Sequence, residues 1–120
     1  MLKNRINSFR YAFKGIARLM RTQPNARIHL FATIVVVSAG FCFDISSAEW
    51  CCCALSIAAV FAAEAFNTAI EDLTDLVSPE YHPLAGHAKD VAAAAVLLMA
   101  IGAAAVGAIL FLPKILDLFR

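Results

Sequence analysis

Apolar residues recur at spacings of three and four along the first segment of the chain. This series consists of Leu2, Ile6, Phe9, Phe13, Ile16 and Met20. Such spacing places the residues on one face of an α-helix, and the cations of the segment lie mostly off that face. The pattern predicts an amphipathic helix over residues 1–24 that lies in a membrane interface, with a soluble bundle helix as the alternative. The stretch "TQPN" at 22–25 is expected to end it.

Three longer apolar stretches follow, at about residues 27–45, 49–75 and 88–113. A membrane span needs roughly 20 residues, so the second and third are long enough, while the first is on the short side and would use its flanks, where Arg27 can extend to the interface. The run 91–112 carries no charge, and Trp50 suits an interfacial position at the start of the second stretch. The chain is 62% hydrophobic, well above the roughly 45–50% of soluble domains. The sequence therefore predicts one all-α integral membrane domain over 1–120, with a surface helix and three transmembrane helices.

The charges are distributed unevenly, although the net charge is only +1. Seven of the ten basic residues lie in the first 27 positions, and the first acid is Asp44. A basic segment of this kind favours the cytoplasmic side of a membrane and anionic lipid headgroups. The N-terminus and the loop near 76–90 are therefore expected in the cytoplasm, and the turn at 44–49 outside. The expected surroundings are a membrane, with no nucleic-acid partner.

The second apolar stretch ends in the polar segment "EAFNTAIEDLTD", residues 64–75. At about 100° per residue, several of its polar side chains share one helical face. They are Glu64, Asn67, Thr68, Glu71 and Asp75. Asp72 lies beside this face and is expected to meet only water. Glu64 has apolar neighbours on both sides, which predicts that it lies deepest in the membrane.

A carboxylate at membrane depth costs a few kcal/mol and therefore usually marks function. Lys89, with Asp90 beside it, is one candidate to neutralise these acids, and Mg²⁺ held by the oxygens of Asn67 and Glu71 is another. An acid kept apart from the metal could accept a proton from a hydroxyl. These are the components of phosphoryl transfer.

Two other functions remain open from the residues alone. A small proton-coupled transporter subunit would use Glu64 as its proton site, and a non-catalytic assembly protein would use the small residues of "IGAAAVGAIL" for helix packing. No phosphate-binding Gly-rich loop of the common soluble kinases occurs in the sequence.

The stretch 64–98, "EAFNTAIEDLTDLVSPEYHPLAGHAKDVAAAAVLL", resembles the signature of the small prokaryotic diacylglycerol kinase and undecaprenol kinase family. Its pattern is E-x-x-N-[ST]-A-I-E-x-x-x-D, a loop, and A-K-D-x-[AG]-[AS]-A-V-L. "FKGI" (13–16) and "NARIHL" (25–30) extend the resemblance over nearly the whole chain. It implies a homotrimer in the bacterial cytoplasmic (inner) membrane. It also implies ATP-dependent phosphorylation of a lipid alcohol, undecaprenol or diacylglycerol, at sites between neighbouring protomers on the cytoplasmic side.

The same resemblance implies roles for individual residues. Glu64 corresponds to the general base, Asn67 to a supporting residue of the nucleotide site and Glu71 to a Mg²⁺ ligand. Lys89 corresponds to the residue that engages the nucleotide phosphates, with Asp90 alongside. A further acid of the motif, with a supporting role, falls on Asp75.

One position departs from the family pattern. Many members have a glutamate just before the first span as a second metal ligand, and that position falls on Gln23. Weaker metal binding, a substitute acid or a shifted loop would each accommodate the neutral amide. Asn25, Arg27 and His29 resemble the undecaprenol-type members, which favours a polyprenol substrate. His29 is expected to form an interhelical hydrogen bond.

Overall fold

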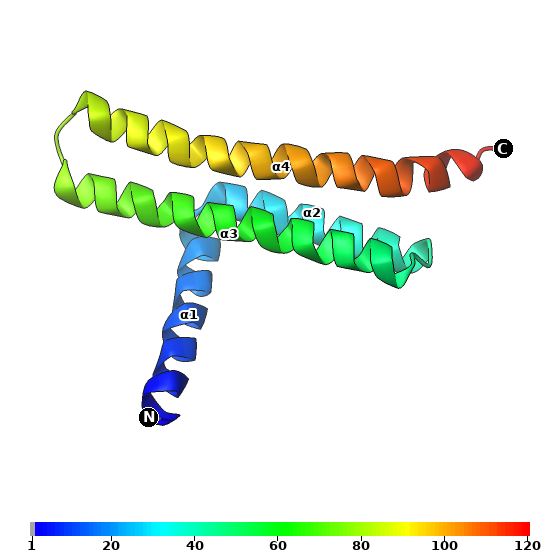
Figure 1. Cartoon of the computed structure of the whole chain (residues 1–120), viewed down its shortest axis with the longest axis horizontal. Coiled ribbons are helices and arrows are strands. Elements are labelled where there is room, and N and C mark those ends of the chain that lie inside the picture. The colour runs from blue at the N-terminus through cyan, green and yellow to red at the C-terminus, as the bar shows by residue number, and fades with distance from the viewer. Residues whose placement is uncertain (1) are drawn as a thin grey trace.

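The computed structural model describes residues 2–120, with side chains from residue 5 onward. Its elements are α1 (Leu2–Thr22), α2 (Pro24–Cys42), α3 (Ser47–Val77) and α4 (Pro83–Asp117), and the described residues form no strand. In Figure 1, α3 and α4 run side by side in opposite directions, α2 lies along α3, and α1 projects away from them at a steep angle. The predicted all-α class with one N-terminal helix and three long apolar helices is confirmed.

α1 leaves its apolar face uncovered by the rest of the chain. Phe9 and Phe13 are each 68% exposed, and Ile6 and Ile16 are also exposed. An apolar face of this kind, next to basic side chains, is typical of a helix that lies in a membrane interface. The side chain of Leu2, expected on the same face, lies outside the described residues.

Proline positions set where two of the helices begin. The break after α1 is confined to Gln23, whose backbone is extended (φ −103°, ψ 113°), and α2 restarts at once at Pro24. α4 begins in the same way at Pro83, where His82 caps the helix by accepting a hydrogen bond from the Leu84 N–H. The missing proline N–H costs nothing in the first turn of a helix. Both helices therefore start earlier than the expected positions 27 and 88.

The turn between α2 and α3 is tightly specified. Asp44 adopts a left-handed backbone conformation (φ 46°), which Asp tolerates better than most residues. Ser46 then caps α3 through a capping box: its hydroxyl accepts from the Glu49 N–H, and the Glu49 carboxylate accepts from the Ser46 N–H. α2 ends at Cys42, three residues before the expected end, because this turn occupies 43–46.

α3 and α4 are longer than a bilayer is thick. At about 1.5 Å per residue, 31 and 35 residues extend about 46 and 52 Å, against a hydrocarbon core of about 30 Å. Glu64 follows Trp50 by 14 positions, or about 21 Å along the helix axis. With Trp50 at one interface, Glu64 falls inside the opposite half of the membrane and the later acids fall near its surface.

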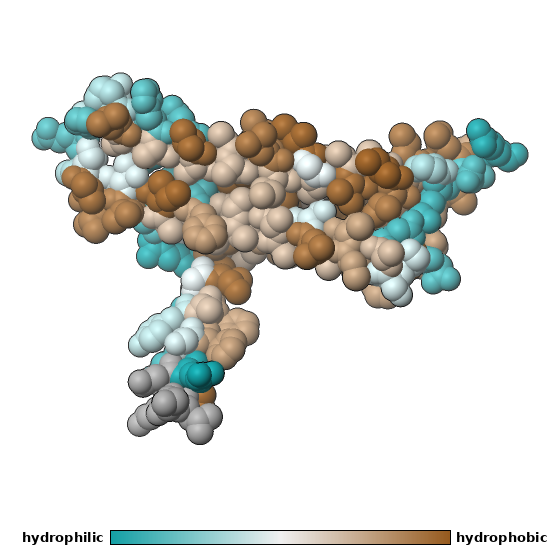
Figure 2. Space-filling model, in the orientation of Figure 1, coloured by the Kyte–Doolittle hydropathy of each residue, from teal (hydrophilic) through white to brown (hydrophobic). Residues whose placement is uncertain are grey.

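A small buried core cluster lies at the end of the bundle away from those acids. Ile45, Cys53 and Phe111 form it, and Trp50 packs against them. A methyl group on Gly40 would come within 2.6 Å of the Trp50 ring, so α2 and the start of α3 approach closely here. The middle of the long helices presents an apolar surface, and hydrophilic residues gather toward their ends (Figure 2). Such a surface suits contact with lipid.

Candidate active site

The polar face of α3 becomes more exposed toward the end of the helix. Glu64 is only 1% exposed, while Asn67 and Thr68 are 7% and 8% exposed. Glu71 is half-buried and Asp75 is exposed. Burial within the fold therefore decreases along this face, and Glu64 is its most enclosed acid.

Glu64 faces a histidine from the neighbouring helix. The Glu64 Oε1 atom lies 3.4 Å from the Nε2 atom of His29 on α2, a contact without hydrogen-bond geometry. Thr68 donates its hydroxyl to the Glu64 backbone carbonyl (2.9 Å), so it satisfies its own polar group without engaging the carboxylate. The result is a buried carboxylate whose nearest charged or ionisable neighbour is an imidazole.

Asn67 is oriented by the next acid on the same face. Its Nδ2 atom donates to Oε1 of Glu71 over 3.1 Å, which leaves the Asn67 Oδ1 atom buried and without a hydrogen bond. Across the described residues, Asn67 Oδ1 and Glu64 Oε1 are the two buried side-chain oxygens in this condition. Native proteins leave few such groups, and each calls for an explanation such as a ligand or a catalytic role.

A polar pocket of about 290 Å³ opens beside these residues, between α2, α3 and α4. Its polar lining comes from Asn25, His29, Asn67 and Glu71, and α4 supplies apolar side chains. Gln23 is not part of this lining; it is half-buried at the start of α2. The pocket therefore gathers Asn67 and Glu71 from the predicted site but not Gln23.

Lys89 joins α3 and α4 near the loop between them. Its Nζ atom forms a hydrogen-bonded ion pair with Oδ1 of Asp75. Asp90 is exposed beside it on α4. The neutralising partner of Lys89 within this fold is thus Asp75, the acid whose predicted role was the least definite.

Asp72 differs from its prediction. It is exposed as expected, but it also forms an ion pair of 2.9 Å with Arg18, which ties α1 to α3. The sequence could not predict this pair, because the two residues are 54 positions apart and meet only where the last turns of α1 approach α3.

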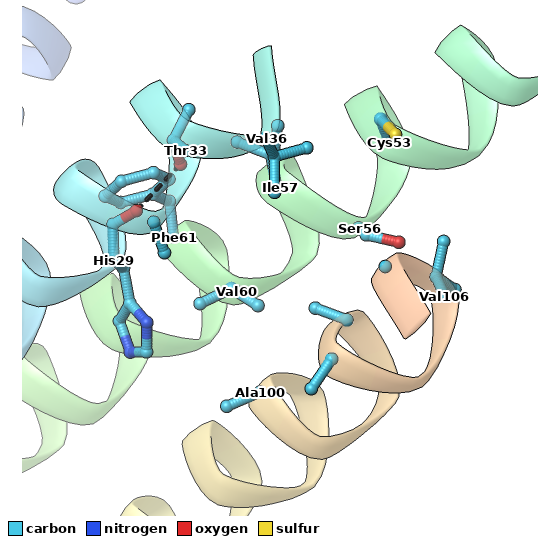
Figure 3. A pocket seen from close by; sticks show the side chains of 14 residues that line it. His29, Thr33, Val36, Cys53, Ser56, Ile57, Val60, Phe61, Ala100 and Val106 are labelled. Atoms are coloured by element: carbon cyan, nitrogen blue, oxygen red, sulfur yellow. Dashed lines mark hydrogen bonds between the residues drawn. The ribbon is translucent and has the colours of Figure 1, made fainter. Parts of the chain in front are cut away.

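An apolar cavity of about 220 Å³ lies within the bundle, and Figure 3 shows the side chains that line it. His29 and Ala100 line both spaces. Figure 3 shows the His29 imidazole at one end of this cavity and Ser56 and Cys53 toward the other. His29 therefore stands where polar and apolar surroundings meet.

The oxygen donors of the pocket do not form a complete metal site by themselves. Across residues 2–120, no three His, Cys, Asp or Glu side chains are grouped so as to hold a metal ion. Glu71 and Asn67 together offer carboxylate and amide oxygens, the ligand type that Mg²⁺ prefers. Mg²⁺ commonly binds through one or two carboxylates together with substrate phosphates and water, so this donor set fits a metal that arrives with a nucleotide.

Comparisons with known proteins point to one family. A family model described as prokaryotic diacylglycerol kinase matches residues 10–111. The chain is 41% identical to an undecaprenol kinase of Bacillus subtilis, over 90% of this chain and 88% of that protein. It is 43% identical to a diacylglycerol kinase of Synechocystis, over 96% of this chain and 66% of that protein. A diacylglycerol kinase of Escherichia coli K12 is 31% identical, over 73% and 72%.

Proposed function

The chain belongs to the prokaryotic diacylglycerol kinase family and is a lipid kinase of the membrane, and on that premise we propose that Glu64 is the general base. The observation that carries the proposal is the burial of Glu64: a carboxylate 1% exposed, with one oxygen lacking a hydrogen bond, at the polar end of an apolar helix. Such a group needs a role that offsets the cost of its burial.

In this reaction the lipid alcohol attacks the γ-phosphorus of ATP. A new O–P bond forms to the lipid oxygen, the bond from the γ-phosphorus to the β-phosphate oxygen breaks, and ADP leaves. The hydroxyl proton passes to the Glu64 carboxylate. Positioning and charge neutralisation carry most of phosphoryl transfer, so one well-placed base beside a polar pocket is an adequate protein contribution.

We assign the nucleotide end of the site to the polar pocket and to Lys89. Glu71 and the unpaired oxygen of Asn67 would hold Mg²⁺, which neutralises phosphate charge when it is bound. Lys89 contacts the phosphates, and Asp75 positions its ammonium group from the facing helix. Asp90 lies alongside Lys89 in the nucleotide site. Gln23 lies outside the pocket lining, so we give it at most an indirect contribution to metal binding.

We further propose that the protein is a homotrimer in the bacterial cytoplasmic membrane, with its N-terminus in the cytoplasm. The basic residues of the first 27 positions and the open apolar surface of the long helices support this arrangement. Arg18 of α1 pairs with Asp72 of α3, so the basic helix and the acidic site lie at the same end of the molecule. That end is therefore the cytoplasmic one, where ATP is available.

Phosphate transfer from radiolabelled ATP to a lipid panel tests this function. Purified protein in mixed micelles receives undecaprenol, diacylglycerol or a long-chain primary alcohol, with Mg²⁺ titrated in each case. We expect transfer to a lipid alcohol that depends on Mg²⁺, with undecaprenol preferred because the segment with Asn25, Arg27 and His29 resembles the undecaprenol-type members of the family. Absence of transfer to every lipid in the panel, from protein that is folded and assembled, would refute the proposal.

A further inference from the structure

The His29 imidazole, on α2, faces the carboxylate of the proposed base, Glu64. Its Nε2 atom is 3.4 Å from Glu64 Oε1, just beyond the usual 2.7–3.2 Å of an N–H···O hydrogen bond. The two side chains are 20% and 1% exposed. Little water can therefore compete for the carboxylate oxygen, and hydrogen bonds of catalytic groups often shorten only when substrate binds.

The rest of the environment leaves His29 with Glu64 as its acidic partner. Glu71, the acid that lines the polar pocket, already accepts from Asn67 over 3.1 Å. Phe61 meets the imidazole edge-on, with ring centroids 6.5 Å apart and planes at 82°, which restricts how the ring can turn. Ala100 of α4, which lines both the polar pocket and the apolar cavity together with His29, offers no polar side-chain group. The imidazole is therefore held in place by packing and pointed at Glu64.

We propose that His29 is a positioning residue for Glu64: its Nε2–H donates to Oε1, and this leaves Oε2 to accept the proton of the lipid hydroxyl. The inference rests on the proposed role of Glu64 as base. A carboxylate that turns freely presents its oxygens in many directions, and a hydrogen bond from a fixed imidazole selects one of them. The buried Oε1 atom, which otherwise has no partner, becomes satisfied in the same step.

His29 is placed to do this at the boundary between two kinds of surroundings. It lines the polar pocket, where we place the nucleotide, and also the apolar cavity that Figure 3 shows. The reacting hydroxyl is attached to a hydrocarbon chain and attacks a charged phosphate, so it must lie at such a boundary. A base held there is oriented toward the hydroxyl rather than toward the water of the pocket.

Replacement of the imidazole by side chains with and without a donor tests the proposal. H29F keeps an aromatic ring but has no donor, and H29Q keeps a donor at nearly the same reach. We expect kcat of H29F to fall by about 10²-fold, the effect of misplacing a catalytic group, with KM for lipid and ATP unchanged. H29Q should recover most of that loss. T33V is the matched control on α2: it removes only the hydroxyl that donates to the His29 carbonyl (2.8 Å) and should keep wild-type kinetics.

The outcomes distinguish the positioning role of His29 from the general-base role of Glu64 on which it rests. Wild-type activity in H29F overturns the positioning role. Equal losses of activity in H29F and H29Q overturn it too. So does a loss of activity accompanied by a raised KM or a lower melting temperature. H29M takes the place of H29F if the phenylalanine variant does not assemble. In the E64Q background H29F should cause no further loss, because its effect acts through Glu64. If E64Q itself retains full activity, the base assignment fails, whatever the histidine variants do.

Discussion

At one end of the α3–α4 pair, the Glu49 carboxylate is fully engaged: one oxygen lies 3.1 Å from the Lys114 ammonium and the other accepts from the Ser46 N–H over 2.7 Å. At the other end, the Glu64 carboxylate is 1% exposed, and one of its oxygens has no hydrogen bond. The same residue type, on the same helix, is thus paired at one end and left incomplete at the other.

This difference separates a region that holds the fold from a region that carries chemistry. The paired end also contains the close contact between Gly40 and Trp50 and the small buried core. Folds satisfy buried polar groups wherever nothing else needs them, and exceptions gather at functional sites. We therefore expect substitutions at the Glu49 end to change stability, and substitutions at the Glu64 end to change catalysis.

The largest effect is expected from the two glutamates of α3. E64Q should lower kcat by about 10²–10⁴-fold, the usual contribution of a general base, without a lower melting temperature, because a neutral amide is less costly to bury. E49Q should keep wild-type kinetics and lower the melting temperature slightly, since glutamine retains the capping box but loses the charge facing Lys114. Phosphate transfer and thermal unfolding in detergent measure both variants. The reverse pattern would mean that the two ends have been assigned wrongly.

The two lysines of α4 offer a second contrast. K89M should raise KM for ATP by about 10-fold or more, because a charge-assisted contact to a phosphate contributes roughly 1.5–3 kcal/mol. K114M removes the partner of Glu49 at the far end and should leave KM for ATP unchanged. ATP titrations at saturating lipid give both constants. An equal KM shift in the two variants would argue against a nucleotide site at Lys89.

Substitution of Asn67 tests whether its Oδ1 atom, which has no hydrogen bond, belongs to a metal site. N67A removes the Oδ1 atom and the donor to Glu71, so we expect the Mg²⁺ concentration for half-maximal activity to rise by about 10-fold. T68V, one position along, removes a hydroxyl that serves only the backbone of α3 and should leave the Mg²⁺ dependence unchanged. An N67A variant with wild-type Mg²⁺ dependence would place the metal elsewhere.

Substitution of Gly40 tests the packing at the Glu49 end of the bundle. G40A would place a methyl group 2.6 Å from the Trp50 ring, and the overpacking should cost about 1–3 kcal/mol of stability, with KM and kcat unchanged after assembly. G102A is the matched control, because an added methyl group there meets nothing within 4 Å. Thermal unfolding of the two variants compares them directly. Equal stability of G40A and G102A would show that this end is less tightly packed than the structure indicates.

The smallest effect is expected where α1 meets α3. Arg18 and Asp72 are 67% and 55% exposed, and exposed ion pairs contribute about 0–1 kcal/mol. R18Q should therefore change activity little in low salt and not at all in high salt, where exposed charges are screened. Activity measured across a salt titration tests this. A large, salt-independent loss would show that α1 takes part in the site itself.

The sequence predicted best those features that depend on the periodicity of apolar and polar residues. A spacing of three and four predicted α1, long uncharged runs predicted the three apolar helices, and about 100° per residue predicted which acids share a face. These are local properties of a helix, so they need no knowledge of its neighbours. Helix ends were predicted less well, because hydropathy locates the part of a helix that suits a bilayer, whereas Pro24 and Pro83 determine where the helices begin.

The contacts between helices were decided by tertiary structure alone. The sequence placed Glu64 at depth and described His29 as an interhelical residue, but it could not bring the two together across 35 positions. It named Lys89 as a candidate to neutralise the acids of α3 without saying which acid, and it left Arg18 without Asp72. Periodicity fixes the face of each helix, but the rotation and offset of one helix against another depend on how their side chains pack. The type of membrane enzyme could therefore be predicted from the sequence, but the pairing of its charged and ionisable groups could not.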